Sequence, residues 1–110
     1  MVVFRNLDKD GDGKVDHFVV EIQNDIGTGS ATIKEITIDG VSIPPEKITL
    51  IIGNRPPRSF DPSSEIYSVY GDKIQIEVEK EGGLQKGEHT LGLRAAVGWQ
   101  EQTVTFRGSI

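Results

Sequence analysis

The chain has no cysteine, and this absence is the first constraint on what it can be. Without thiols it can form neither a disulfide nor a thiolate metal site, and it has no cysteine nucleophile. A chain that needs no disulfide suits a reducing compartment. We therefore expect a cytoplasmic location, with an extracellular location as the alternative.

Long apolar runs and an excess of positive charge are also missing. No run approaches the roughly 18 residues of a membrane-spanning helix, and the apolar start Met1–Arg5 is too short for a signal-peptide core. The net charge is −5, and lysine and arginine alternate with acidic residues instead of forming a stripe that could follow phosphates. We expect a soluble chain with no membrane insertion and no nucleic-acid partner.

What the chain does contain is a dense series of turns between short β-branched segments. Its 110 residues suit one core, so residues 1–110 are expected to form a single domain. Thirteen glycines and five prolines cluster between these segments, and no window has a sustained helical period. The sequence predicts an all-β fold: a small antiparallel β-sandwich of about six to seven strands, of jelly-roll or immunoglobulin-like type.

Period-two alternation of apolar residues places the strands. The predicted segments are Val15–Ile22, Thr32–Ile38 before an Asp39-Gly40 turn, Lys47–Ile52, a hairpin formed by Ile74–Val78 and Leu91–Ala95 around Gly82-Gly83-Leu84, and Thr103–Arg107. Ile33 is out of phase with Ile36, which predicts either a bulge or a change of face before the turn. Leu91, Leu93, Val104 and Phe106 share one phase and are expected in one core.

No group of residues in the sequence predicts catalysis by the chain alone. His17 and His89 are the ordinary acid-base groups near neutrality, but no motif links them, and we interpret both as structural or exposed. Gly27-Thr28-Gly29 lacks a following helix, so it is a turn and not a phosphate-binding loop. The acidic pair Asp61 and Glu65 is interpreted as part of a solvated loop.

The sharpest local feature is the acidic stretch from Asp8 to Asp16. Its D-x-D-x-D-G pattern gathers carboxylates around a glycine turn, and oxygen ligands of this kind suit Ca²⁺. The candidate metal ligands are Asp8, Asp10, Asp12 and Asp16, with Lys14 through its carbonyl. The twelfth position is Val19 where an EF-hand has glutamate, so we expect a structural calcium-binding turn between strands, with an acidic turn kept polar for solubility as the alternative.

Several turns and strand edges together resemble a known family. They are Phe4-Arg5-Asn6, Ile36–Gly40, Ile43–Ile48, Tyr70-Gly71-Asp72 and Gly82–His89, which in order and spacing resemble the small beta subunit of C-glycoside deglycosidases. The resemblance extends from Phe4 to about Leu93. It implies a β-sandwich accessory subunit. Its implied partner is a larger catalytic alpha subunit, a TIM barrel that holds the divalent metal and cleaves C-glycosidic bonds.

Two other classes of protein remain open from the sequence. The stretch Asp10–Asp16 followed by a strand is similar to parts of archaeal pilin and cell-surface sandwiches, which would make the chain an extracellular, calcium-braced structural module. A carbohydrate-binding module is a weaker alternative, because Trp99, Tyr67 and Tyr70 are its only candidate binding aromatics. The expected partner is a larger catalytic subunit or, alternatively, further copies of the chain.

Overall fold

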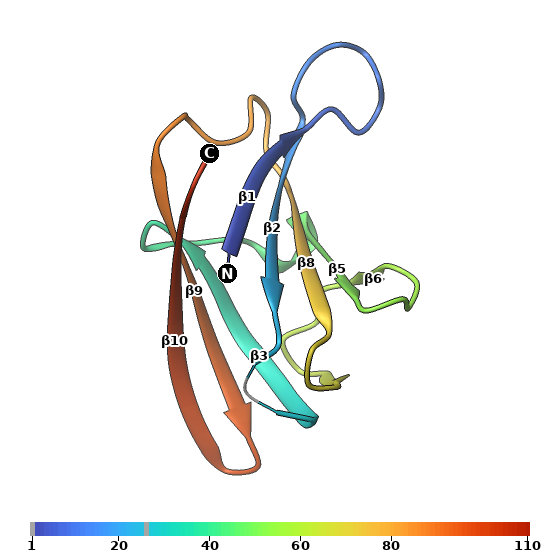
Figure 1. The fold of residues 1–110 in the computed structure, drawn as a ribbon, viewed down its shortest axis with the longest axis vertical. Coiled ribbons are helices and arrows are strands. Elements are labelled where there is room, and N and C mark those ends of the chain that lie inside the picture. The colour runs from blue at the N-terminus through green and yellow to red at the C-terminus, as the bar shows by residue number, and fades with distance from the viewer. Residues whose placement is uncertain (1, 26) are drawn as a thin grey trace.

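The computed structural model describes residues 2–25 and 27–110, which form two antiparallel sheets packed face to face (Figure 1). The strands are β1 (Val2–Leu7), β2 (His17–Gln23), β3 (Gly29–Ile38), β4 (Val41–Ser42), β5 (Ile48–Ile52), β6 (Arg58–Ser59), β7 (Glu65–Ser68), β8 (Lys73–Glu79), β9 (Glu88–Val97) and β10 (Gln100–Ser109). A 3₁₀ turn, η1 (Pro45–Lys47), precedes β5. The predicted all-β, two-sheet class is confirmed.

The order of the longer strands defines the type of sandwich. One sheet runs β1-β2-β8-β5 with the short β6 at its edge, and the other runs β10-β9-β3 with β4 and β7 both paired to β3. Setting aside the short β4, β6 and β7, the remaining strands follow the order of a constant-type immunoglobulin sandwich, ABED on one sheet and GFC on the other. Of the two predicted types, the topology is therefore the immunoglobulin-like one.

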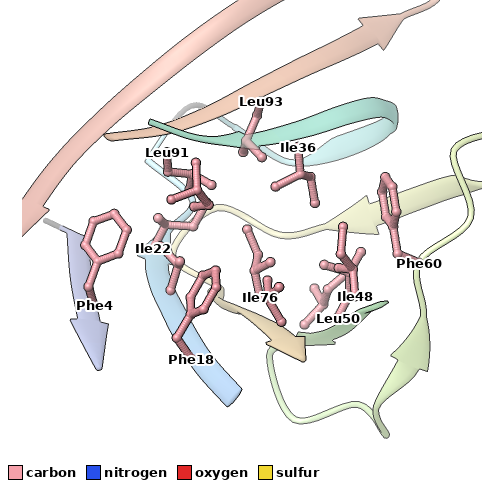
Figure 2. Close-up of a cluster of buried hydrophobic side chains, with 14 of the residues drawn as sticks. Phe4, Phe18, Ile22, Ile36, Ile48, Leu50, Phe60, Ile76, Leu91 and Leu93 are labelled. Atoms are coloured by element: carbon pink, nitrogen blue, oxygen red, sulfur yellow. The ribbon is translucent and has the colours of Figure 1, made fainter. Parts of the chain in front are cut away.

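The core lies between the two sheets and is built from inward-facing aliphatic and aromatic side chains (Figure 2). Phe18, Ile76 and Leu50 come from one sheet and Ile36 and Leu91 from the other, and none of these side chains is more than 1% exposed. Alternation along each strand explains this arrangement, because every second side chain points to the same face of a sheet. Burial of these side chains is the main source of folding free energy.

Two local features of β3 follow the sequence prediction. The pairing of β3 with β9 shifts register between Ile33 and Glu35, and this bulge lets both Ile33 and Ile36 pack inward. Asp39 and Gly40 then form a two-residue turn to β4, with φ of +53° and +82°. An Asp-Gly pair suits this turn because both positions lie in the left-handed region.

Other segments depart from the prediction. The expected hairpin between Ile74–Val78 and Leu91–Ala95 is wrong, because β8 pairs with β2 and β5 while β9 belongs to the opposite sheet. The connection instead crosses between the sheets, with Leu84 buried beneath it. Residues 55–64, where no strand was predicted, contain the short strand β6 and the buried Phe60. No helix among the described residues is long and apolar enough to span a bilayer.

Candidate functional site

The acidic loop, Asp8–Asp16, joins β1 to β2 at one end of the molecule, which is the upper end in Figure 1. The amide of Asp16 donates a 3.1 Å hydrogen bond to the carbonyl of Leu7 and closes the base of the loop. At its side, the Nζ of Lys9 lies 3.3 Å from the carboxylate of Glu77, which is buried on β8. The loop is thus fastened to the sheet at its base and at one side.

Within the loop, carboxylates accept hydrogen bonds from backbone amides. Asp8 accepts from Gly11 at 2.9 Å and from Gly13 at 2.7 Å, one amide to each oxygen. Asp16 accepts from Lys9 at 2.9 Å and from Asp10 at 3.4 Å, again with separate oxygens. These bonds satisfy amides that a tight turn would otherwise leave to solvent.

The structure brings together only part of the predicted ligand set. Ligand oxygens of Asp8, Asp10 and Asp16 lie within 4.8 Å of one another, whereas Asp12 is not part of this group. Asp12 instead accepts a 2.8 Å hydrogen bond from the amide of Lys14. The residue at the twelfth position, Val19, is buried in β2 and has no ligand atom on its side chain. A calcium site here would therefore rest on Asp8, Asp10 and Asp16.

The hydrogen bonds and charges of the loop shift the pKa values of two of its carboxyl groups in opposite directions. His17, whose Nδ1 lies 2.7 Å from Asp16, and the amide of Lys9 together lower the pKa of Asp16 to about 2. The hydrogen bond from the Asp12 amide lowers the pKa of Asp10, but desolvation and the neighbouring Asp8 and Asp12 carboxylates outweigh it, so the pKa of Asp10 is raised. Negative charge is therefore crowded at Asp10, which is where a cation would relieve repulsion.

His89 lies at the start of β9, next to the β3–β4 turn. Its Nδ1 is 2.6 Å from the carboxylate of Asp39, and its Nε2 is 2.6 Å from the carbonyl of Gln85. The ring also contacts Phe4, with a centroid separation of 6.0 Å. Both nitrogens are thus engaged by acceptors, which leaves no free base and favours the structural interpretation of this histidine.

The remaining sequence candidates serve turns. Asp61 accepts hydrogen bonds from the amide and hydroxyl of Ser63, at 2.9 and 2.7 Å, and from the hydroxyl of Ser64 at 2.9 Å. The Ser63 hydroxyl and amide are the largest causes of a lowered pKa at Asp61, the opposite of what a general acid needs. Gly27-Thr28 leads directly into strand β3 and not into a helix, which agrees with its interpretation as a turn. The hydroxyl of Thr28 accepts a 2.9 Å hydrogen bond from the amide of Tyr70.

A second surface, which the sequence reading did not join into one site, lies at the opposite end. There the β9–β10 hairpin extends past the other strands, at the lower end of Figure 1. Beneath it is an apolar hollow of about 330 Å³ between the two sheets, lined by side chains that include Ile33, Ile74, Val97 and Val104. Trp99, at the hairpin tip, is 98% exposed. We call the hollow and this tip the hairpin end.

The sequence contained part of the signal for the hairpin end. Trp99 was recognisable as an exposed aromatic because it follows Gly98 in a turn, and Val104 and Phe106 were correctly assigned to the core face. Val104 and Phe106 are only partly buried, however, because they lie on the edge strand β10 and line the hollow. The relative lengths of two packed sheets depend on pairings distant in sequence, and periodicity does not carry that information.

Fold and sites together define an immunoglobulin-like sandwich with an acidic loop at one end and an apolar surface at the other. The family model of the C-glycoside deglycosidase beta subunit matches residues 2–99 of the 110-residue chain. The chain therefore belongs to this family, and the resemblance drawn from its turns is confirmed. Among curated proteins, none is similar enough to the chain to be matched.

Proposed function

We propose that the chain is the accessory, non-catalytic subunit of a C-glycoside-cleaving lyase and packs on a larger catalytic alpha subunit. The observation that carries this proposal is the family match over residues 2–99. A beta subunit by definition works beside a different chain. The alpha subunit would be a TIM barrel that holds the divalent metal and the catalytic groups, and the sandwich would support it.

The chemistry of the described residues supports an accessory role. His89 has both ring nitrogens occupied by oxygen acceptors, and Asp61 has a lowered pKa, so neither is prepared to move a proton to or from a substrate. The hollow at the hairpin end is lined mainly by apolar side chains, and among its described lining residues Asp25 is the one ionisable group. Such a surface suits protein packing better than bond cleavage.

A mass measurement on the complex tests the proposal. The chain is purified alone, the alpha subunit of the same source is purified alone, and each is run with and without the other on size exclusion with light scattering. We expect a stable species whose mass is the sum of whole numbers of both subunits. Two unshifted peaks at micromolar concentrations would contradict the proposal.

A second candidate function concerns the acidic loop, as in an extracellular, calcium-braced module. The observation that favours it is the approach of Asp8, Asp10 and Asp16 within 4.8 Å. Bound Ca²⁺ would brace the β1–β2 connection and take no part in catalysis. This role is compatible with the accessory subunit, because the loop lies at the end of the molecule opposite the β9–β10 hairpin (Figure 1).

A further inference from the structure

Exposed apolar side chains gather at the hairpin end, away from the acidic loop. Trp99 is 98% exposed and Val97 is 59% exposed. Tyr70 and Val69, in the turn after β7, are exposed too, and the amide of Tyr70 bonds to Thr28 just before β3. Leaving an indole wholly in water forgoes much of the free energy that its burial would supply. Large apolar side chains that stay exposed beside an apolar hollow are typical of interaction sites on soluble proteins.

Hydrogen bonds join two of the connections at the rim of the hollow. The side-chain nitrogen of Asn24 lies 2.9 Å from both the carbonyl of Gly27 and the hydroxyl of Ser68 and 3.2 Å from the carbonyl of Val69, so its two hydrogens are shared among three acceptors. The amide of Val69 in turn donates to Asp72 at 2.8 Å. These bonds tie the β2–β3 and β7–β8 connections together. A rim fixed in advance loses less entropy on binding than a mobile one.

The charges around the hollow indicate what kind of group could bind there. Among the lining residues of the hollow that the structure describes, Asp25 alone is ionisable. Near the tip, Arg94 lies 3.0 Å from Glu101 and 3.6 Å from Glu35 and so offsets part of the charge of these two carboxylates. The chain as a whole carries −5, and the four aspartates and two lysines of the acidic loop at the other end account for −2 of this. The hollow itself therefore suits an uncharged, apolar occupant.

We propose that the hairpin end is the surface by which the chain docks on the alpha subunit, with Trp99 inserted into an apolar pocket of that subunit. This inference rests on the proposed function, because the family match is what makes a different subunit the occupant and not a second copy. An apolar side chain of the alpha subunit fills the hollow in return. A protruding tryptophan next to a preformed hollow is the arrangement typical of binding hot spots.

The test uses the single tryptophan of the chain as a probe. The chain is labelled with 5-fluorotryptophan, so one ¹⁹F resonance reports on Trp99 while the unlabelled alpha subunit is silent. On adding the alpha subunit we expect this resonance to shift and to lose its solvent-isotope effect. A complex that forms by light scattering while the resonance stays solvent-exposed would overturn the docking surface and leave the proposed function standing.

Affinities of substituted chains for the alpha subunit test the same surface independently. Trp99→Ala and Val97→Asp should each weaken binding to the alpha subunit at least about tenfold, as loss of a hot-spot contact does. Val41→Asp is the matched control, because Val41 is 64% exposed on β4, outside the lining of the hollow, and should leave affinity within about twofold. Equal effects of Val97→Asp and Val41→Asp would contradict the proposal.

A second copy of the chain is the competing occupant. If labelled Trp99 becomes buried as the concentration of the isolated chain rises, in step with dimer mass by sedimentation, the alpha-subunit assignment is overturned. If the wild-type chain forms no complex at all with the alpha subunit, the proposed function itself fails. The docking inference fails with it.

Discussion

The imidazole Nδ1 of His89 lies 2.6 Å from a carboxylate oxygen of Asp39, which joins the start of β9 to the turn between β3 and β4. The other carboxylate oxygen of Asp39 accepts the amide of Thr90 at 2.9 Å. On the far side of the ring, Nε2 faces the carbonyl of Gln85 at 2.6 Å. Only the doubly protonated imidazolium can donate to both oxygens, so the native geometry favours the charged form.

This contact predicts how stability depends on pH. Hydrogen bonding to Asp39 and then to Gln85 raises the pKa of His89 above 6.5, so its contribution is complete below pH 6.5 and is lost as the pH rises through the folded pKa. Hydrogen bonding to His89 and Thr90 lowers the pKa of Asp39 below 3.8, so its contribution is present above pH 3.8 and is lost as the pH falls through the folded value.

We therefore expect the unfolding free energy from urea titrations to fall as the pH rises from below 6.5 through the raised pKa of His89 in the folded protein. His89→Gln keeps a polar side chain but cannot titrate, so the difference in stability between wild type and variant should shrink over the same range. A pH-independent difference would show that the His89–Asp39 contact is not charge-assisted.

The two neighbouring glycines of the β8–β9 connection should differ in how much an alanine substitution destabilises the fold. Gly82 and Gly83 both have left-handed φ, of +79° and +65°, but a Cβ at Gly82 would meet nothing within 4 Å. A Cβ at Gly83 would collide with the side chain of Asn6 and lie 2.8 Å from Cγ1 of Val15. Asn6 cannot easily move, because its amide group bonds to the amide and carbonyl of Leu84, at 2.8 and 3.0 Å.

Thermal melts of Gly82→Ala and Gly83→Ala measure this contrast. The first should cost about 1 kcal/mol for the unfavourable φ alone, and the second should cost more, by about 1–3 kcal/mol, through overpacking and loss of the Asn6 contacts. Equal melting temperatures would mean that Asn6 is not fixed against the β8–β9 connection.

Differences in burial between β9 and β10 predict how much stability is lost when a core side chain is truncated to alanine. Leu91 and Phe106 are paired in register, but Leu91 is wholly buried while Phe106 is only partly buried. Leu91→Ala should therefore cost about 2–5 kcal/mol, and Phe106→Ala should fall below the roughly 3–5 kcal/mol of a fully buried phenylalanine. Chemical denaturation of both variants provides the measurement, and a larger loss at Phe106 would contradict the observed burial.

The acidic loop predicts a weak stabilisation by calcium that depends on particular carboxylates. At a hundredfold excess over Kd, binding to the folded state alone adds about 2.7 kcal/mol, and with no glutamate at the twelfth position we expect Kd on the order of 10⁻⁴ to 10⁻³ M. Asp10→Asn should abolish the rise in melting temperature, whereas Asp12→Asn, outside the 4.8 Å group, should retain it. Identical melts in calcium and in chelator would leave the loop as a solubility turn.

Much of the architecture could be predicted from local pattern. The bulge after Ile33 and the Asp39-Gly40 turn were predictable because periodicity and turn chemistry act over a few residues. The crossover after β8 was not, because a Gly82-Gly83 turn fits a hairpin as well as a change of sheet. The change of sheet depends on the pairing of β8 with β2 and β5 and of β9 with β3, which joins residues distant in sequence.

The candidate sites divide in the same way. The acidic loop was evident from its spacing, but the separation of Asp12 from Asp8, Asp10 and Asp16 depends on which amides each carboxylate accepts. The Asp39–His89 contact joins residues whose proximity depends on the pairing of β3 with β9. The hairpin end needed the register of both sheets before its hollow could be located.

Reconstitution of activity tests the central claim most directly. The alpha subunit of the same source, the chain, and an equimolar mixture of the two are each assayed for cleavage of a C-glycosidic bond, with product followed by chromatography. The account predicts no turnover by the chain alone and a rate for the mixture well above that of the alpha subunit alone. Cleavage by the isolated chain, or a mixture no faster than the alpha subunit alone, would contradict it.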